Sequence, residues 1–331
     1  MRTKLAAALL IVYVVWGSTY LAIAVASRTL PPLLMLAARF GLAGALLWAW
    51  SARRGDLARH RPGRREWTAA AVVGGLLLFV ETGAVAWAEQ RVPSGTTALL
   101  IASVPLFTAL VDRSCFGIRL SGGGVAGIAT GLLGVALLVG GGASVDPVGA
   151  AVILFGTLAW AAGSAYARVA PLPRAPFLSA AMQMLCAAAL LALGGVATGE
   201  ASRVHLGAIS WASAGAFAFL VVFGSLVAFT AYGWLLRSGA SSVVVSTYAY
   251  VNPAVAVLLG WALVGEPVGG RELAAGAVIL ASVGMLLVAR EPRVAAEPVA
   301  ESIGAYIRRK DAQADFPRPV PPLADLRRIA A

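Results

Sequence analysis

The chain contains ten apolar runs that are each long enough to cross a lipid bilayer as a helix. They cover approximately residues 5–26, 33–51, 68–88, 92–112, 122–140, 147–167, 177–197, 211–235, 241–263 and 270–289. A membrane-spanning helix needs about 17–25 apolar residues, and the short connections leave no room for a soluble catalytic domain. Because 60% of the residues are hydrophobic and 12% are charged, we predict an all-α polytopic membrane protein with ten transmembrane helices.

Two of these runs share one pattern of proline and glycine. Pro105 is followed by glycines twelve and seventeen residues later, and Pro253 repeats this spacing 148 residues further along the chain. A duplicated unit of five spans must insert its two copies with opposite orientation. We therefore predict two inverted five-helix repeats, residues 1–140 and 141–290, that face each other across a shared cavity, and a tail at residues 291–331. This organisation is typical of secondary transporters.

The net charge of +11 is distributed unevenly along the chain. Most of the 26 Lys and Arg residues lie in the N-terminus, the tail and the alternate loops on the same side. An excess of basic residues marks the cytoplasmic face, so both termini are predicted to be cytoplasmic and no nucleic-acid partner is expected. A cleaved signal peptide ending near Ala26 is the alternative for the first run, but the length of that run favours a retained span. The composition of the tail predicts a largely disordered segment.

A stripe of glycines in the fifth run predicts close contact with a neighbouring helix. Gly123, Gly127 and Gly131 are spaced four residues apart, which lets a second backbone approach closely. Packing inside the bundle is the favoured interpretation, because a ten-helix bundle has many internal contacts. A homodimer interface remains the alternative.

Two charged residues stand well inside predicted spans. Arg39 lies about 9 Å and Glu81 about 10 Å from the same end of the bundle, at 1.5 Å rise per residue. A charge at membrane depth is costly and indicates function. Glu81 is a candidate for binding a substrate ammonium or a coupling proton, and Arg39 for binding a substrate carboxylate. A permanent ion pair between them that fixes helix register is the equally weighted alternative.

Aromatic and polar residues supply the other candidates for lining a cavity. Aromatic faces with hydroxyl tips suit amphipathic solutes and organic cations, although packing or contact with lipid also explains single residues. Trp160 and Tyr248 are favoured because their neighbours are small and polar. The full set is Trp16, Ser18, Tyr20, Trp160, Tyr166, Tyr232, Tyr248, Tyr250 and Asn252.

The two matched prolines, Pro105 and Pro253, predict interruptions in two helices. Proline removes a backbone donor and clashes with the preceding turn. Broken helices at matching places in two repeats indicate a substrate site or a gate hinge. A passive kink that only serves packing is the alternative.

Short sequences in several runs occur in a characteristic order. They are Trp16-Gly-Ser-Thr-Tyr20, Pro31-Pro32, Arg39-Phe40, Val92-Pro-Ser-Gly95, Val104-Pro-Leu-Phe-Thr108, Trp160-Ala-Ala-Gly-Ser-Ala-Tyr166, Phe223-Gly-Ser225, Ser246-Thr-Tyr-Ala-Tyr-Val-Asn-Pro253 and Gly265-Glu266. Together they resemble the EamA-type carriers of the drug/metabolite transporter superfamily, in its bacterial inner-membrane branch. The resemblance covers roughly residues 5–289. It implies a central substrate cavity between two inverted repeats, and export or exchange of small metabolites such as amino acids.

The chain departs from the family pattern at one position. The Gly-Glu pair after the fourth span of each repeat occurs here only as Gly265-Glu266, since the first half has Gly117-Ile118. A role shared by two such glutamates is therefore not expected.

The sequence offers no catalytic or metal-binding pattern. His60 and His205 fall in loops, and no His, Cys and carboxylate cluster has metal-ligand spacing. We therefore expect no enzyme activity, no cofactor and no metal, and predict a secondary active transporter with alternating access. A lipid or lipid-linked sugar translocator, and a receptor or assembly subunit without flux, are the alternatives.

Overall fold

The structure is a computed structural model that describes residues 2–88, 97, 100–139, 146–259 and 270–289. Within these ranges all regular structure is helical and no strand occurs. Six helical stretches are long and apolar enough to cross a membrane: Thr3–Ile23, Pro32–Arg53, Arg64–Ala88, Pro147–Val169, Pro176–Ala197 and Trp211–Arg237. Gly122–Gly134 and Leu273–Leu286 are shorter apolar helices. The predicted all-α class is confirmed, and the count of ten spans remains a prediction.

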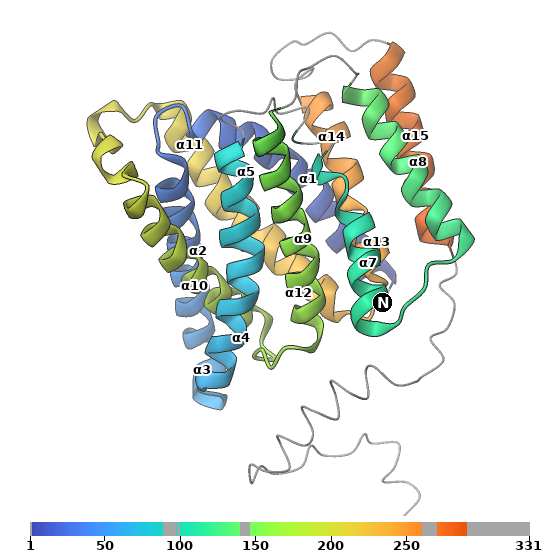
Figure 1. Ribbon diagram of the computed structural model, residues 1–331. Helices are drawn as coiled ribbons and strands as arrows, with labels where there is room; N and C mark the ends of the chain where they lie inside the picture. The colour runs from blue at the N-terminus through green and yellow to red at the C-terminus, as the bar shows by residue number, and fades with distance from the viewer. Residues whose placement is uncertain (1, 89–96, 98–99, 140–145, 260–269, 290–331) are drawn as a thin grey trace, which may run out of the picture.

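The helices follow one another along the chain with few irregular connections (Figure 1). They are α1 (Arg2–Ala26), α2 (Pro32–Arg53), α3 (Asp56–Arg59), α4 (Arg64–Gly74), η1 (Gly75–Glu81), α5 (Thr82–Ala88), α7 (Val104–Phe116), α8 (Gly122–Val139), α9 (Pro147–Val169), α10 (Pro176–Ala197), α11 (Trp211–Phe219), η4 (Leu220–Phe229), α12 (Thr230–Arg237), α13 (Ser242–Ser246), α14 (Tyr248–Leu259) and α15 (Gly270–Val288). The short 3₁₀ turns η2 (Glu200–Arg203) and η3 (Leu206–Ala208) connect α10 to α11. The η1 and η4 segments are π-helical, so α4–η1–α5 and α11–η4–α12 each have a π-helical middle.

Prolines and caps determine where several helices begin and end. Pro32 and Pro147 are the first residues of α2 and α9, where the missing N–H group has no helical partner to lose. The Asp146 carboxylate accepts a hydrogen bond from the Gly149 amide at 2.9 Å and caps α9. Gly117 follows α7 with φ 66°, a left-handed conformation that glycine adopts without strain.

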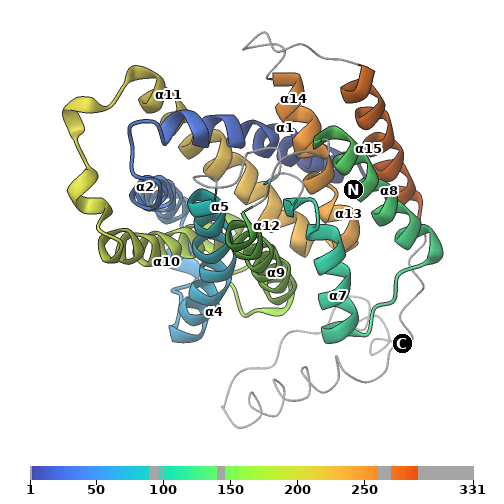
Figure 2. The same ribbon diagram turned by 45° about the horizontal axis from the view of Figure 1, so that its top comes forward.

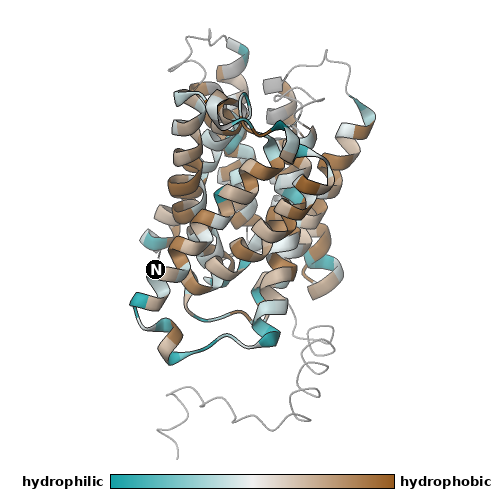
Figure 3. Ribbon diagram, turned by 90° about the vertical axis from the view of Figure 1, so that its left-hand side faces the viewer, coloured by the Kyte–Doolittle hydropathy of each residue, from teal (hydrophilic) through white to brown (hydrophobic). Residues whose placement is uncertain are grey.

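The bundle interleaves helices from both predicted halves of the chain. Helices α2 and α10 lie side by side at one flank, and α8 and α15 lie side by side at the other (Figures 1 and 2). Between these flanks, α1 packs on α14 and η4, while α9 packs on α7 and η1. Apolar residues predominate along the helices, and hydrophilic residues are frequent in the segments at the end where the chain begins (Figure 3). We call the end where α1 begins the N-terminal end of the bundle.

The glycine stripe of α8 faces α15 inside the bundle. A Cβ atom on Gly127 would lie 2.8 Å from the side chain of Leu286, and one on Gly131 would lie 2.7 Å from Ser282 Oγ. Ser282 Oγ also donates a hydrogen bond to the Gly127 carbonyl at 2.8 Å. The stripe is therefore used for internal packing, and a homodimer remains an untested prediction.

The matched prolines lie in different local settings. Pro105 is the second residue of α7, directly after a turn at Ala102 and Ser103. Pro253 lies inside α14, and the interruption between α13 and α14 falls earlier, at Thr247. Both helices are thus interrupted on the N-terminal side of the proline, and a hinge role remains a prediction. The tail and Gly265-Glu266 lie outside the described residues.

Candidate functional site

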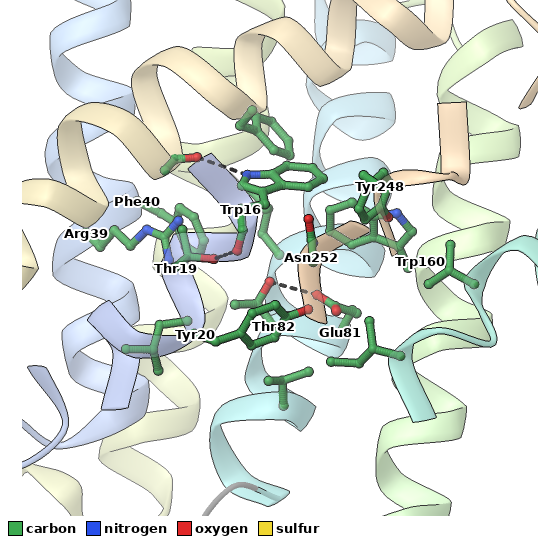
Figure 4. A pocket seen from close by; sticks show the side chains of 17 residues that line it. Trp16, Thr19, Tyr20, Arg39, Phe40, Glu81, Thr82, Trp160, Tyr248 and Asn252 are labelled. Atoms are coloured by element: carbon green, nitrogen blue, oxygen red, sulfur yellow. Dashed lines mark hydrogen bonds between the residues drawn. The ribbon is translucent and has the colours of Figure 1, made fainter. Parts of the chain in front are cut away.

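A partly open cavity lies among the central helices, and its space together with the open solvent at its mouth amounts to about 660 Å³. Seven of the predicted residues line it: Trp16, Tyr20, Arg39, Glu81, Trp160, Tyr248 and Asn252 (Figure 4). Ile23, Val85 and Ile101 also line it, and they come from helix segments far from the N-terminal end. This central cavity therefore occupies the half of the bundle that faces away from the N-terminal end.

Arg39 is held at the cavity by the π-helical segment η4. Its side chain is only 5% exposed, and its Nε donates a hydrogen bond to Ser225 Oγ at 2.9 Å. Gly224 makes room for the guanidinium, because a Cβ there would lie 2.7 Å from Arg39 Nη2. A guanidinium has five N–H donors, so Ser225 uses one and leaves capacity for an anionic group.

Glu81 lies on the other side of the cavity from Arg39 (Figure 4). It is the last residue of the π-helical segment η1, and its Oε2 accepts a hydrogen bond from Thr82 Oγ1 at 3.0 Å. The same hydroxyl lies 3.3 Å from the Leu77 carbonyl five residues earlier. π-helical segments often mark functional sites. Here η1 carries Glu81, and η4 carries Ser225, which binds Arg39. The predicted direct pair between Arg39 and Glu81 remains untested.

Four aromatic side chains meet at the face of the cavity nearest the N-terminal end. Trp16 contacts Trp160, Tyr232 and Tyr248, with ring centroids 5.0–5.4 Å apart. Trp160 Nε1 donates a hydrogen bond to the Tyr232 hydroxyl at 2.9 Å, and Ser164 Oγ lies 2.7 Å from the same oxygen. We call these four rings the aromatic cluster. It joins α1, α9, α12 and α14 and gives the cavity a rigid aromatic wall.

Replacing Tyr232 with Phe is expected to destabilise this cluster. The change keeps the ring but removes the acceptor of the Trp160 indole N–H, and a buried polar group left unpaired costs about 1–3 kcal/mol. Ser164 Oγ loses one contact and keeps its hydrogen bond to the Trp160 carbonyl at 2.7 Å. We expect the melting temperature of the detergent-solubilised protein to fall by several degrees. Tyr166→Phe is the matched control, because it removes a hydroxyl from α9 outside the cluster. Equal melting temperatures for the two variants would contradict the role given to the Tyr232 hydroxyl.

Asn252 connects the cavity wall to α1. It is 2% exposed, and its amide nitrogen, when oriented towards the carbonyls of Tyr13 and Tyr248, donates to them at 3.3 and 3.0 Å. Next to it, the Tyr13 hydroxyl and Thr247 Oγ1 lie 2.5 Å apart. Asn252 therefore links α1 to the first turn of α14, directly after the turn at Thr247 that separates α13 from α14.

The other predicted site residues lie outside the described lining of the cavity. Tyr232 belongs to the aromatic cluster, Ser18 Oγ donates to the Val14 carbonyl of its own helix at 2.6 Å, and half-buried Tyr166 packs against the main core. Tyr250 is fully buried and donates to the Ile128 carbonyl of α8 at 3.3 Å. In the described part of the chain, no three His, Cys, Asp or Glu side chains are grouped to hold a metal ion.

The sequence did not reveal two residues that line the cavity and one buried carboxylate that lies away from it. Thr19 and Phe40 line the cavity. Asp112 is 2% exposed and forms an ion pair with Arg168. The sequence analysis selected Ser18 in place of its neighbour Thr19, and Arg39 without its neighbour Phe40. Asp112 is the last residue of its predicted span. The signal that the sequence offered was an aspartate at the end of an apolar run.

Comparisons with known proteins agree on one family. The model of the EamA-like transporter family matches residues 3–140 and again residues 147–288. The chain is 40% identical over 296 residues to the inner membrane transporter YedA of Escherichia coli strain K12, covering 87% of this chain and 94% of that one. It is also 28% identical over 288 residues to a probable terminal-alkyne amino-acid exporter of Streptantibioticus cattleyicolor, covering 83% and 91%.

A solved crystal structure shares the fold. Its TM-score is 0.70 at 22% identity, over 88% of this chain and 99% of the other chain. Together with the long apolar helices, these likenesses describe a multi-pass inner-membrane protein, as the sequence predicted. The chain belongs to the EamA-like transporter family.

Proposed function

We propose that the protein is a secondary active exporter or exchanger of small zwitterionic metabolites such as neutral amino acids. The observation that carries this proposal is the placement of Arg39 and Glu81 on opposite sides of one aromatic-walled cavity. A guanidinium binds a carboxylate and a carboxylate binds an ammonium through charge-assisted hydrogen bonds. The Glu81 carboxylate accepts a hydrogen bond from the Thr82 hydroxyl, and it lines the same cavity as Arg39.

The aromatic cluster favours substrates with an apolar part. Aromatic walls contact apolar groups over a large area, and most of the remaining lining is aliphatic. One relative is named as an amino-acid exporter, which supports both the substrate class and the outward direction. We infer transport without chemical change of the substrate, with both termini in the cytoplasm.

Alternating access between two inverted repeats is the proposed mechanism. Several of the main helix contacts recur when the halves are exchanged. As α1 packs on α14 and η4, so α9 packs on α7 and η1, and α2 packs on η4 as α10 packs on η1. In this correspondence α2 is equivalent to α10 and α8 is equivalent to α15, so each flanking pair consists of two equivalent helices. This pattern and the two successive family matches support the boundaries 1–140 and 141–290.

Counterflow in proteoliposomes tests the proposed function. Vesicles loaded with an unlabelled neutral amino acid are diluted into a trace of the same labelled compound, with leucine, phenylalanine and tryptophan as separate probes. We expect at least one label to accumulate transiently above its equilibrium level, which only an exchanging carrier produces. Substrate binding without flux would indicate a receptor, and movement of a fluorescent phospholipid in its place would indicate a lipid translocator. Either result would contradict the proposal.

A further inference from the structure

A second charged cluster lies at the N-terminal end of the bundle, away from the central cavity. Asp112 of α7 is 2% exposed. Its Oδ1 accepts a hydrogen bond from Arg168 Nη2 of α9, and its Oδ2 accepts one from Ser242 Oγ of α13. The Arg168 guanidinium also lies over the Phe116 ring of α7, 4.6 Å from its centroid. Both carboxylate oxygens are thus occupied by partners from two other helices.

These contacts join helices from opposite halves of the chain. Helix α7 belongs to the first predicted repeat, whereas α9 and α13 belong to the second. All three residues lie near the helix ends at the N-terminal end of the bundle (Figure 1). The two halves are therefore tied to each other at this end, on the side of the aromatic cluster opposite to the cavity.

The cluster is the outermost of three successive contacts that separate the cavity from the N-terminal end. The aromatic cluster comes first, and the Tyr13–Thr247 hydrogen bond comes next. Arg168 lies eight residues beyond Trp160 on α9, which is about 12 Å further along the helix. Asp112 is buried and the Arg168 side chain is 20% exposed. The pair holds the geometry of this end, because removing Arg168 would leave the Asp112 carboxylate buried without its countercharge.

Under the repeat symmetry, α1 corresponds to α9 and the ninth run corresponds to α7. The sequence has no ion pair at these corresponding positions. The first span has no charged residue between Lys4 and Arg28, so α1 has no counterpart of Arg168. The ninth run has no Asp or Glu between residues 241 and 265, so it has no counterpart of Asp112. These positions therefore hold no second copy of the Asp112–Arg168 pair.

We propose that Asp112, Arg168 and Ser242 form a gate that holds the N-terminal end closed while the central cavity is accessible from the opposite end. This inference rests on the proposed alternating-access function. Separation of Asp112 from its two partners frees α7 from α9 and α13, and the N-terminal end opens. The gate sets the balance between the two access states, and it needs no contact with the substrate.

Thiol labelling tests the gate without a substrate. The full-length protein is freed of its two cysteines, Cys115 and Cys186, and receives a single reporter cysteine. Thr108→Cys is the inner reporter, because Thr108 is buried one helical turn from Asp112 on the way to the cavity. Val85→Cys is the opposite reporter, because Val85 lines the cavity. A membrane-impermeant maleimide is added in turn to each side of sealed vesicles.

The variant Asp112→Asn is expected to raise labelling of Thr108→Cys from the N-terminal side by about tenfold, a typical size for coupling between two states. Labelling of Val85→Cys from the other side is expected to fall. Arg168→Gln should change the labelling of both reporters in the same direction. Combining it with Asp112→Asn should change the labelling little beyond either single variant. An unchanged labelling rate of Thr108→Cys in the folded Asp112→Asn protein would overturn the proposal.

Two further variants complete the experiment. Asp146→Asn replaces the carboxylate that caps the other end of α9, and it should leave both reporters unchanged. Ser242→Ala removes only one hydrogen bond, so it gives a smaller rise in Thr108→Cys labelling and provides the test if Asp112→Asn does not fold.

Counterflow measured on the same vesicles distinguishes the gate from the proposed transport function. A labelling response without counterflow contradicts transport alone, and counterflow without a labelling response contradicts the gate alone.

Discussion

Replacing Glu81 with Gln is expected to lower counterflow of a neutral amino acid by about 10- to 100-fold, because a hydrogen bond to a charged group contributes about 1.5–3 kcal/mol. Gln keeps the shape of the side chain and an oxygen for the Thr82 hydroxyl, but it loses the negative charge that would bind the substrate ammonium. The loss should be confined to substrates that carry an ammonium. An N-acetylated analogue, which has none, should be transported equally by the variant and the unchanged protein.

Glu200→Gln is the matched control for this prediction. Glu200 is also a buried carboxylate, 3% exposed, but it accepts a hydrogen bond from the Leu34 amide at the start of α2 and does not line the cavity. Its replacement should leave the rate of counterflow unchanged. If Glu81→Gln exchanges the zwitterion at the unchanged rate, Glu81 does not bind the ammonium.

The same variant separates substrate binding from coupling to protons. If Glu81 carries a coupling proton, Glu81→Gln keeps exchange but loses transport driven by a pH gradient. If Glu81 binds the substrate, both activities fall together. We expect the second result, because Glu81 shares the cavity with Arg39 and the aromatic cluster. Counterflow and gradient-driven uptake by the same proteoliposomes distinguish the two.

Replacing Gly74 with Ala is expected to have the largest effect on stability. Gly74 ends α4 where the third span crosses α10, and an added Cβ would lie inside the contact distance of the Gln183 backbone carbonyl. Backbone cannot rotate away as a side chain can, so the two helices must separate. Overpacking of this kind costs roughly 3 kcal/mol, and we expect a fall of roughly 5–10 °C in melting temperature.

Gly75→Ala is the control from the next position along the chain. A Cβ on Gly75 would meet Leu190 Cδ1 at 3.5 Å, which is ordinary contact, so the melting temperature should change little. Both proteins are compared by thermal unfolding in the same detergent. A Gly74→Ala protein as stable as Gly75→Ala would show that α4 and α10 are not in close contact.

The sequence predicted the helices well because lipid imposes a simple rule. Every backbone polar group must be satisfied within a span, so long apolar runs become helices, and Pro32 and Pro147 lie where two of them begin. The six stretches that qualify as membrane spans each match a predicted run. The π-helical segments η1 and η4 were not predicted, because their register depends on tertiary contacts such as Arg39 with Ser225.

The site was predicted less completely, because the sequence does not show which face of an apolar helix points inwards. Tyr248 and Tyr250 are two positions apart, about 200° around a helix, and only Tyr248 reaches the cavity while Tyr250 packs against α8. In α1, Thr19 lines the cavity in place of Ser18. Arg39 and Glu81 were found because a charge stands out in any apolar run, whichever way it points.

A structure of the protein with a bound neutral amino acid tests the central claim most directly. The amino acid that gives the strongest counterflow is added during purification, and the complex is solved at a resolution that orients the ligand. The account predicts that the ligand lies in the central cavity, with its carboxylate at Arg39, its ammonium at Glu81 and its apolar side chain against the aromatic cluster. A ligand bound elsewhere, or bound in the cavity with neither charge satisfied by these two residues, would contradict it.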